Sequence, residues 1–197
     1  MRKRIEHIGL IAICSISALL ILTALTISIF ESLQSKRTTY ELPPELCLGL
    51  FGKYPDEFFE TTYPMYDSCE DFRTYAEVSR EGNLVLRLTE EQEIVALQYA
   101  DAGIEEFATV PGVEIADDYT SFTITGNEDS IADIVFTKYP VWTAHDMAFR
   151  QLFSGKDPET ISVTCTVVEE NTKEVLYTAT WPQESIDLSI EGGKFIP

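Results

Sequence analysis

An uninterrupted hydrophobic stretch dominates the pattern at the start of the chain. Residues 8 to 30 include no charged side chain. At about 1.5 Å rise per residue, a helix of these 23 residues is about 34 Å long, enough to cross a hydrocarbon core of about 30 Å. The sequence therefore predicts a transmembrane helix over residues 8 to 30.

The residues that flank this stretch set its expected orientation. Arg2, Lys3 and Arg4 directly precede it and favour a cytoplasmic N-terminus. A cleaved secretory signal peptide is the alternative, but its apolar core is normally about 7 to 15 residues long and ends at a small-x-small site. This stretch is longer and has no A-x-A pattern at its end. We expect residues 1 to 7 in the cytoplasm, an uncleaved signal anchor, and a domain outside a cell membrane.

A polar segment separates the predicted anchor from the rest of the chain. Residues 31 to 46 are mostly polar, and Pro43-Pro44 favours extended backbone. We therefore expect a stalk over residues 31 to 46 and one outer domain over residues 47 to 197.

The first half of the outer domain alternates between strand and helix patterns. Apolar and polar positions alternate on both sides of the turn at 81–83, which predicts a hairpin. The residues Thr89 to Gln92 match a helix capping box. We expect this helix to end at Gly103 or soon after, before Pro111-Gly112. The apolar positions expected to face the core are Leu84, Leu86 and Leu88 in the hairpin and Ile94, Leu97, Ala100 and Ile104 in the helix.

The second half ends in the clearest strand pattern of the chain. Strands are predicted at 113–115 and 122–124 with a bend between them, and 131–139 fits either a helix or a strand. A second helix is expected from a cap at Thr143 through Phe153, with a stop at Gly155. Residues 161–167 and 175–181 then alternate on both sides of a turn at 170–173.

Together these elements predict an α+β fold. We expect an antiparallel β-sheet with two packed helices, preceded by a single N-terminal transmembrane helix. The spatial order of the strands is not readable from the pattern.

Charge is distributed very unevenly between the two parts. Residues 1 to 37 hold five of the 14 basic and two of the 33 acidic residues, so they carry +3, whereas the other 160 residues carry -22. Nucleic-acid binding needs a basic surface and is excluded for a domain this acidic. Such a field instead attracts cations and basic peptides.

Two cysteines in the outer part are candidates for a disulfide. Cys47 and Cys69 lie 22 residues apart on either side of an aromatic-rich segment. In an oxidising compartment such a pair most simply forms a bond worth about 3 kcal/mol. Two buried thiols, or a different pairing with Cys165, are the alternatives. Cys165 lies at an apolar position of its strand and is expected in the core.

No catalytic motif is present in the chain. His145 is the only histidine beyond residue 7, and it is expected to be a packed or surface residue rather than a base or a metal ligand. The chain has no GxSxG, SxxK, GxxxxGK[ST], CxxC or HExxH pattern, so neither an enzyme nor a cofactor is expected. Acidic clusters around Asp117-Asp118 and 127–129 suit calcium in composition, but no EF-hand spacing occurs.

These patterns favour a binding protein. We expect a single-pass protein, held in the lipid bilayer through residues 8 to 30, whose acidic domain binds a partner protein, a basic peptide or a cation. A structural subunit of a membrane complex and an extracytoplasmic carboxylate-based hydrolase are the alternatives. The absence of an N-x-[ST] sequon fits a bacterial envelope slightly better than a glycosylated eukaryotic protein.

Overall fold

The computed structural model describes residues 37–60, 75–138, 140–191 and 194–196. The chain divides into two compact units, residues 1–38 and 39–197. The predicted membrane segment, 8 to 30, lies outside the described residues. None of the described helices is long and apolar enough to cross a membrane.

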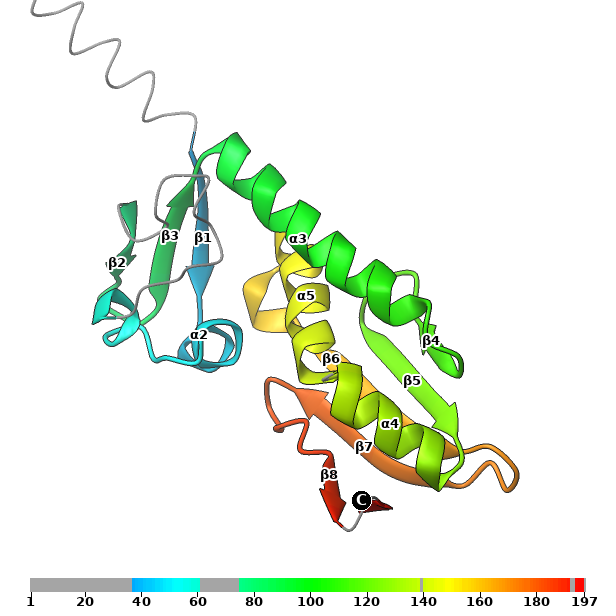
Figure 1. Ribbon diagram of the computed structural model, residues 1–197. Coiled ribbons are helices and arrows are strands. Elements are labelled where there is room, and N and C mark those ends of the chain that lie inside the picture. Colours follow the sequence, from blue (N-terminus) through cyan, green and yellow to red (C-terminus); the bar gives the residue numbers. More distant parts are fainter. Residues whose placement is uncertain (1–36, 61–74, 139, 192–193, 197) are drawn as a thin grey trace, which may run out of the picture. The chain divides into compact units, whose positions relative to one another are not determined.

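The second unit begins with a small sheet and a short helix (Figure 1). The sheet has three strands in the order β1-β3-β2. The elements are β1 (Thr38–Leu42), α2 (Pro44–Phe51), a 3-10 turn (Phe58–Glu60), β2 (Glu77–Val78) and β3 (Leu84–Leu88).

Residues 38 to 46 are folded and do not form the expected stalk. Leu42, at the end of β1, and Leu46, in the first turn of α2, are buried in the core. The polar residues around them lie on the exposed faces of the same two elements. Pro44 begins α2, a position at which the missing N–H of proline costs nothing. The folded unit therefore starts at Thr39 rather than near Leu46.

The predicted hairpin is confirmed. β2 and β3 pair antiparallel with Val78 opposite Leu84. Leu84, Leu86 and Leu88 are buried as expected. Val85 is buried as well, since β3 is the central strand of this sheet, whereas Val78 on the edge strand is 41% exposed.

The capping box is also confirmed, but the burial of one residue in the helix that follows was predicted wrongly. The Thr89 N–H donates to Gln92 Oε1 at 2.9 Å and the Gln92 N–H donates to Thr89 Oγ1 at 3.2 Å, at the start of α3 (Glu90–Ala108). The helix continues past Gly103 and ends at Ala108, before Pro111-Gly112, within the expected range. Ala100 and Ile104 are buried as expected, but Ile94 is 48% exposed, because it lies beside the face that packs, which is formed by Gln92, Ala96, Ala100, Ile104 and Phe107.

The main sheet has four strands in the order β4-β5-β6-β7. They are β4 (Val113–Ile115), β5 (Ser121–Gly126), β6 (Val163–Glu169) and β7 (Val175–Trp181). The β4-β5 and β6-β7 pairs are antiparallel, as predicted, but β5 and β6 run parallel. The sheet is therefore mixed rather than antiparallel, because the chain between β5 and β6 forms helices that carry it back to the same end of the sheet.

Two helices make up that crossover. The ambiguous segment forms α4 (Glu128–Lys138), and the second expected helix is α5 (Pro140–Phe153), which Gly155 follows at φ +86°. Thr143 does not cap α5 but lies within it and is 4% exposed, because proline starts the helix three residues earlier. A 3-10 turn (Pro158–Thr160) precedes β6, and β8 (Ser189–Glu191) and β9 (Lys194–Ile196) form a final antiparallel pair.

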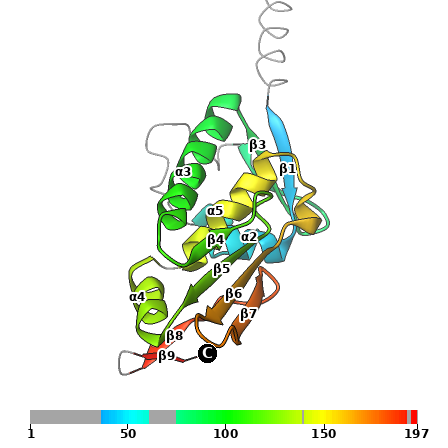
Figure 2. The ribbon, with the colours of Figure 1, turned by 90° about the vertical axis from the view of Figure 1, so that its right-hand side faces the viewer.

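The core lies between the helices and one face of the main sheet. α3 and α5 run side by side in both ribbon views, and α5 also contacts β6 (Figures 1 and 2). Alternate residues of β6 are buried, so one face of the sheet packs inward. Buried Gln151 links α5 to the strand ends, because its Nε2 donates to the carbonyl oxygens of Tyr119 at 2.7 Å and Ser162 at 3.0 Å.

Candidate functional site

A cleft of about 250 Å³ opens where α3, the end of α4 and α5 meet. The described residues that line it are Gly103, Glu106 and Phe107 from α3, Thr137 from α4, and Trp142, Thr143 and Asp146 from α5. Phe107 and Thr143 are buried and form its inner part. Two of these lining residues are acidic and none is basic.

Close contact between α3 and α5 brings the first carboxylate into this cleft. A Cβ atom at position 103 would collide with the carboxylate oxygen Oδ2 of Asp146. Only glycine leaves room for the Asp146 side chain against the α3 backbone. The Arg150–Asp101 ion pair, with Nε and Oδ1 3.1 Å apart, joins the same two helices one turn further along. Gly103 therefore positions an acidic group instead of ending a helix.

The carboxyl group of Asp146 is strongly perturbed by its surroundings. Burial raises the pKa of its carboxyl group from 3.8 to about 7. Within the described part of the chain, no hydrogen bond or ion pair satisfies this carboxylate. At neutral pH the cleft thus holds a partly ionised acid for which the described residues supply no counter-ion, and Glu106 adds a second carboxylate to the lining.

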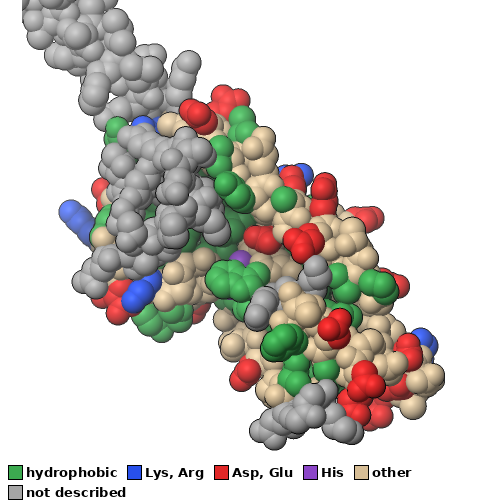
Figure 3. Space-filling model, viewed as in Figure 1, with side chains coloured by type: hydrophobic (Ala, Val, Ile, Leu, Met, Phe, Trp, Pro, Cys, Tyr) green, Lys and Arg blue, Asp and Glu red, His purple; other side chains and the backbone are tan. Residues whose placement is uncertain are grey.

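An exposed tryptophan adjoins the two acids. Trp142 is 60% exposed, and its ring packs edge-on against His145 with 5.2 Å between ring centroids. Trp142 and Asp146 are four positions apart, so both lie on the same face of α5. On the surface shown in Figure 3, hydrophobic side chains lie beside acidic side chains.

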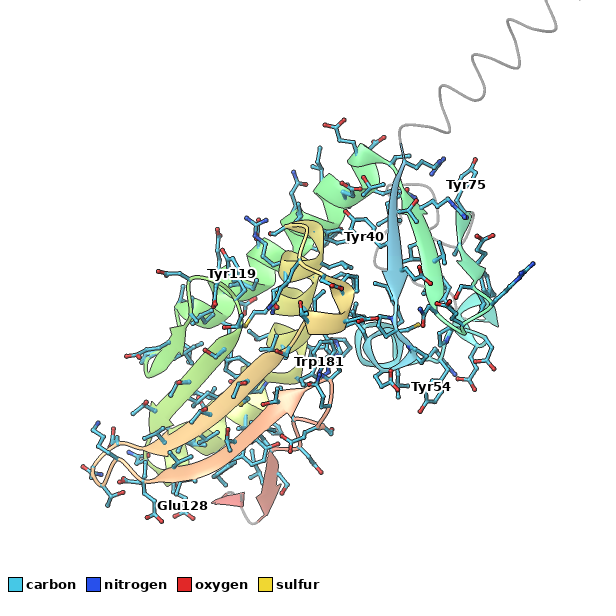
Figure 4. The ribbon with its side chains drawn as sticks, turned by 180° about the vertical axis from the view of Figure 1, so that it is seen from behind. Tyr40, Tyr54, Tyr75, Tyr119, Glu128 and Trp181 are labelled. Carbon is cyan, nitrogen blue, oxygen red and sulfur yellow. The ribbon has the colours of Figure 1, made fainter. Side chains whose placement is uncertain are left out.

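His145 packs between two tryptophans. Its ring lies 5.2 Å from Trp142 and 5.3 Å from Trp181, centroid to centroid. Burial lowers the pKa of its imidazole from 6.5 to about 4, so the ring is neutral at physiological pH. Trp181 in turn contacts Gly49 of α2, and Figure 4 shows it beside that helix. His145 is a packed residue, and its neutral ring supports Trp142.

The structure describes only one member of the expected disulfide. Cys47 is buried in α2, and its thiol donates to the Lys53 carbonyl oxygen at 3.3 Å. Burial, with a smaller contribution from the charge of Asp56, raises the pKa of Cys47 to about 12. Cys69 lies outside the described residues, so the predicted Cys47–Cys69 bond stays a prediction.

Cys165 is confirmed as a core residue. It is 0% exposed in β6. Burial raises the pKa of its thiol to about 12, so it stays protonated at neutral pH. A protonated buried thiol is not a nucleophile.

The two acidic loops considered for calcium lie at opposite ends of β5. Asp118 follows β4 and accepts hydrogen bonds from Thr120 N at 3.1 Å and Thr120 Oγ1 at 2.7 Å. Residues 127–129 follow the other end of β5, about 20 Å away for a strand of six residues. Tyr119 and Glu128 mark these two ends in Figure 4. No group of three or more metal-ligating side chains occurs among the described residues.

The aromatic segment around residue 58 is only partly described. Phe58 is fully buried and packs edge-on against Phe51, with 5.0 Å between ring centroids. Tyr54 and Phe59 are 49% and 40% exposed. Part of this segment therefore covers the core beside α2. The remaining aromatic residues between 61 and 74 lie outside the described residues.

The sequence reasoning did not select Gly103, Trp142 or Asp146 as site residues. The spacing of four residues between Trp142 and Asp146 was visible in the sequence, but the predicted helix began at Thr143 and left Trp142 outside it. The contribution of Gly103 depends on which helix packs against α3, and that is a tertiary property.

Comparison of the chain with family models, with curated proteins and with solved structures gives no significant match.

Proposed function

We propose that this protein is a single-pass membrane protein whose acidic extracytoplasmic domain binds a basic segment of a partner protein. The cleft of Glu106, Trp142 and Asp146 is the site at which this segment docks. The anchor is residues 8 to 30, and the N-terminus is cytoplasmic.

One observation carries the proposal, namely the half-buried Asp146 carboxylate without a counter-ion among the described residues. Burial removes part of the hydration of this charge, and the described part of the chain offers no ion pair in return. A cationic ligand supplies the missing charge and is bound more tightly because the site is already partly desolvated.

The charge of the whole outer part supports the same ligand class. A net charge of -22 over residues 38 to 197 raises the local concentration of basic partners and speeds their association. It repels nucleic acids and anionic lipid surfaces. The exposed ring of Trp142 adds a surface on which a cation binds favourably.

The membrane part of the proposal is tested by fractionation and by labelling. The chain is expected to stay in the membrane pellet after a carbonate wash and to be cleaved by protease added to intact cells or spheroplasts. Release of a shortened soluble domain would contradict the uncleaved anchor and leave the binding proposal standing.

The binding part is tested by titrating the full chain, in a non-ionic detergent, with a basic peptide at several salt concentrations. We expect affinity to fall steadily as salt increases, because screening weakens the attraction between the charged partners. Affinity that does not depend on salt would contradict charge-led recognition.

A second candidate function is carboxylate-based hydrolysis, and one observation favours it. Asp146, with its pKa raised to about 7, and Glu106 line one cleft, and a raised carboxyl pKa suits a general acid. The binding function is preferred because the strong negative field and the exposed Trp142 both favour a cationic ligand, and hydrolysis requires neither. Turnover of a panel of nitrophenyl glycosides at pH 5 to 8 that disappears in Asp146→Asn would reverse this preference.

A further inference from the structure

The size of the cleft limits what enters it. Its volume is about 250 Å³, which is below the range of about 300 to 1,000 Å³ that is typical of sites for drug-sized ligands. The buried Phe107 and Thr143 close its inner end. The cleft therefore accommodates one side chain of a partner rather than a folded segment.

The lining residues of the cleft select a cation with a flat, weakly hydrated head. The carboxylates of Asp146 and Glu106 attract a positively charged group, and the exposed Trp142 offers it an aromatic surface. A guanidinium stacks on an indole ring and forks onto carboxylate oxygens, whereas an ammonium is a strongly hydrated point charge. An arginine side chain therefore loses less hydration free energy than a lysine side chain when it enters a half-buried cleft.

We propose that the cleft lined by Gly103, Glu106, Trp142 and Asp146 is a receptor for an arginine side chain of the partner. The guanidinium stacks on Trp142 and pairs with the carboxylate of Asp146. Gly103 keeps this position open, because any side chain there displaces Asp146. The inference rests on the proposed function and deepens it by naming the residue that is recognised.

The test compares two peptides of equal charge. Capped hexaarginine and capped hexalysine are titrated separately into the full chain in a non-ionic detergent at constant ionic strength, and dissociation constants are measured by calorimetry. Because both peptides experience the same long-range field, a difference between them reports the cleft. We expect wild type to bind hexaarginine at least fivefold more tightly than hexalysine.

Four variants locate this preference. Trp142→Leu is expected to remove the arginine preference, whereas Phe136→Leu, at another exposed aromatic residue of 70% exposure, keeps it. Asp146→Asn is expected to weaken hexaarginine binding at least tenfold. Glu105→Gln also removes one negative charge, but Glu105 is an exposed residue of α3 and does not line the cleft, so we expect less than a twofold change.

The outcomes separate this inference from the proposed function. Equal binding of the two peptides to wild type, or equal effects of Asp146→Asn and Glu105→Gln, overturns the arginine receptor and leaves charge-led binding standing. If neither peptide binds wild type at low salt, the proposed function fails and the inference fails with it. Circular dichroism of each variant checks that the fold is retained.

Discussion

Replacement of Asp146 by asparagine is expected to stabilise the protein at and above neutral pH. The two side chains have nearly the same shape, so the variant keeps the packing against Gly103 and removes the charge. In the folded chain the carboxyl pKa is about 7, raised by burial from 3.8. Because the folded state disfavours ionisation of Asp146, the folded state loses stability relative to the unfolded state at a pH where this carboxyl group is ionised.

The size of the effect follows from the pKa shift. The shift is about three units, and each unit corresponds to about 1.4 kcal/mol, which gives a ceiling of about 4 kcal/mol. Because the carboxylate opens onto a cleft that solvent enters, part of this penalty is relieved. We therefore expect Asp146→Asn to raise the free energy of unfolding by about 1 to 3 kcal/mol at pH 8.

The pH dependence gives the sign a second check. Between pH 4 and 7 the folded chain holds a proton on Asp146 that the unfolded chain has lost, so this group makes stability fall as pH rises. The gain from Asp146→Asn is therefore expected to be absent near pH 4, to grow through this window and to be complete above pH 7. His145 acts in the opposite direction between about pH 4 and 6.5, because its folded pKa is lowered.

Urea denaturation of wild type and variant, followed by tryptophan fluorescence at pH 4.5, 6, 7 and 8, measures the difference. For Asp146→Asn, the free energy of unfolding is expected to rise from pH 4.5 to 6.5. The variant lacks the opposing effect of Asp146, so the stabilisation that comes from deprotonating His145 becomes visible. A parallel series in the His145→Gln background removes that contribution. A variant that is less stable than wild type at pH 8, or a difference independent of pH, would refute the reasoning about the buried carboxylate.

Three further substitutions test the packing around the site and the helix start. Gly103→Ala should push the Asp146 carboxylate toward water, so that its pKa falls from about 7 toward the usual value near 3.9, and an unchanged carboxylate titration by NMR would contradict this. Gly49→Ala should lower the free energy of unfolding by about 1 to 2 kcal/mol, since the added methyl group meets the rigid Trp181 ring, and unchanged urea midpoints would argue against that contact. Thr89→Ala should cost about 1 kcal/mol in the same assay through loss of the capping box, and a change below about 0.3 kcal/mol would count against the cap.

Elements set by near neighbours were predicted well from the sequence. The strands at 163–169 and 175–181 follow from strict alternation, and the start of α3 follows from a four-residue capping pattern. Both depend on interactions that span a few residues, so the local sequence contains all the necessary information. Gly155 likewise ends α5, because its left-handed φ suits glycine.

Predictions that needed knowledge of the packing partner were wrong. Ala100 and Ile104 are buried as expected, but Ala96 rather than Ile94 is buried with them, because the close contact between α3 and α5 sets which side of the stripe packs. Thr143 has a good capping side chain, yet Pro140 begins the helix earlier. A polar composition suggested a stalk over residues 31–46, although Leu42 and Leu46 within it are buried.

The sequence by itself determined the charge separation, the long apolar segment, the mixed α and β content and the chemistry of each side chain. Tertiary structure decided that β5 and β6 pair in parallel and that Asp146 sits against Gly103 beside Trp142. The physical reason is the separation along the sequence between the residues that interact. Hydrophobic periodicity and capping act between residues near in sequence, whereas the burial of a carboxylate and the raising of its pKa depend on the helix that covers it.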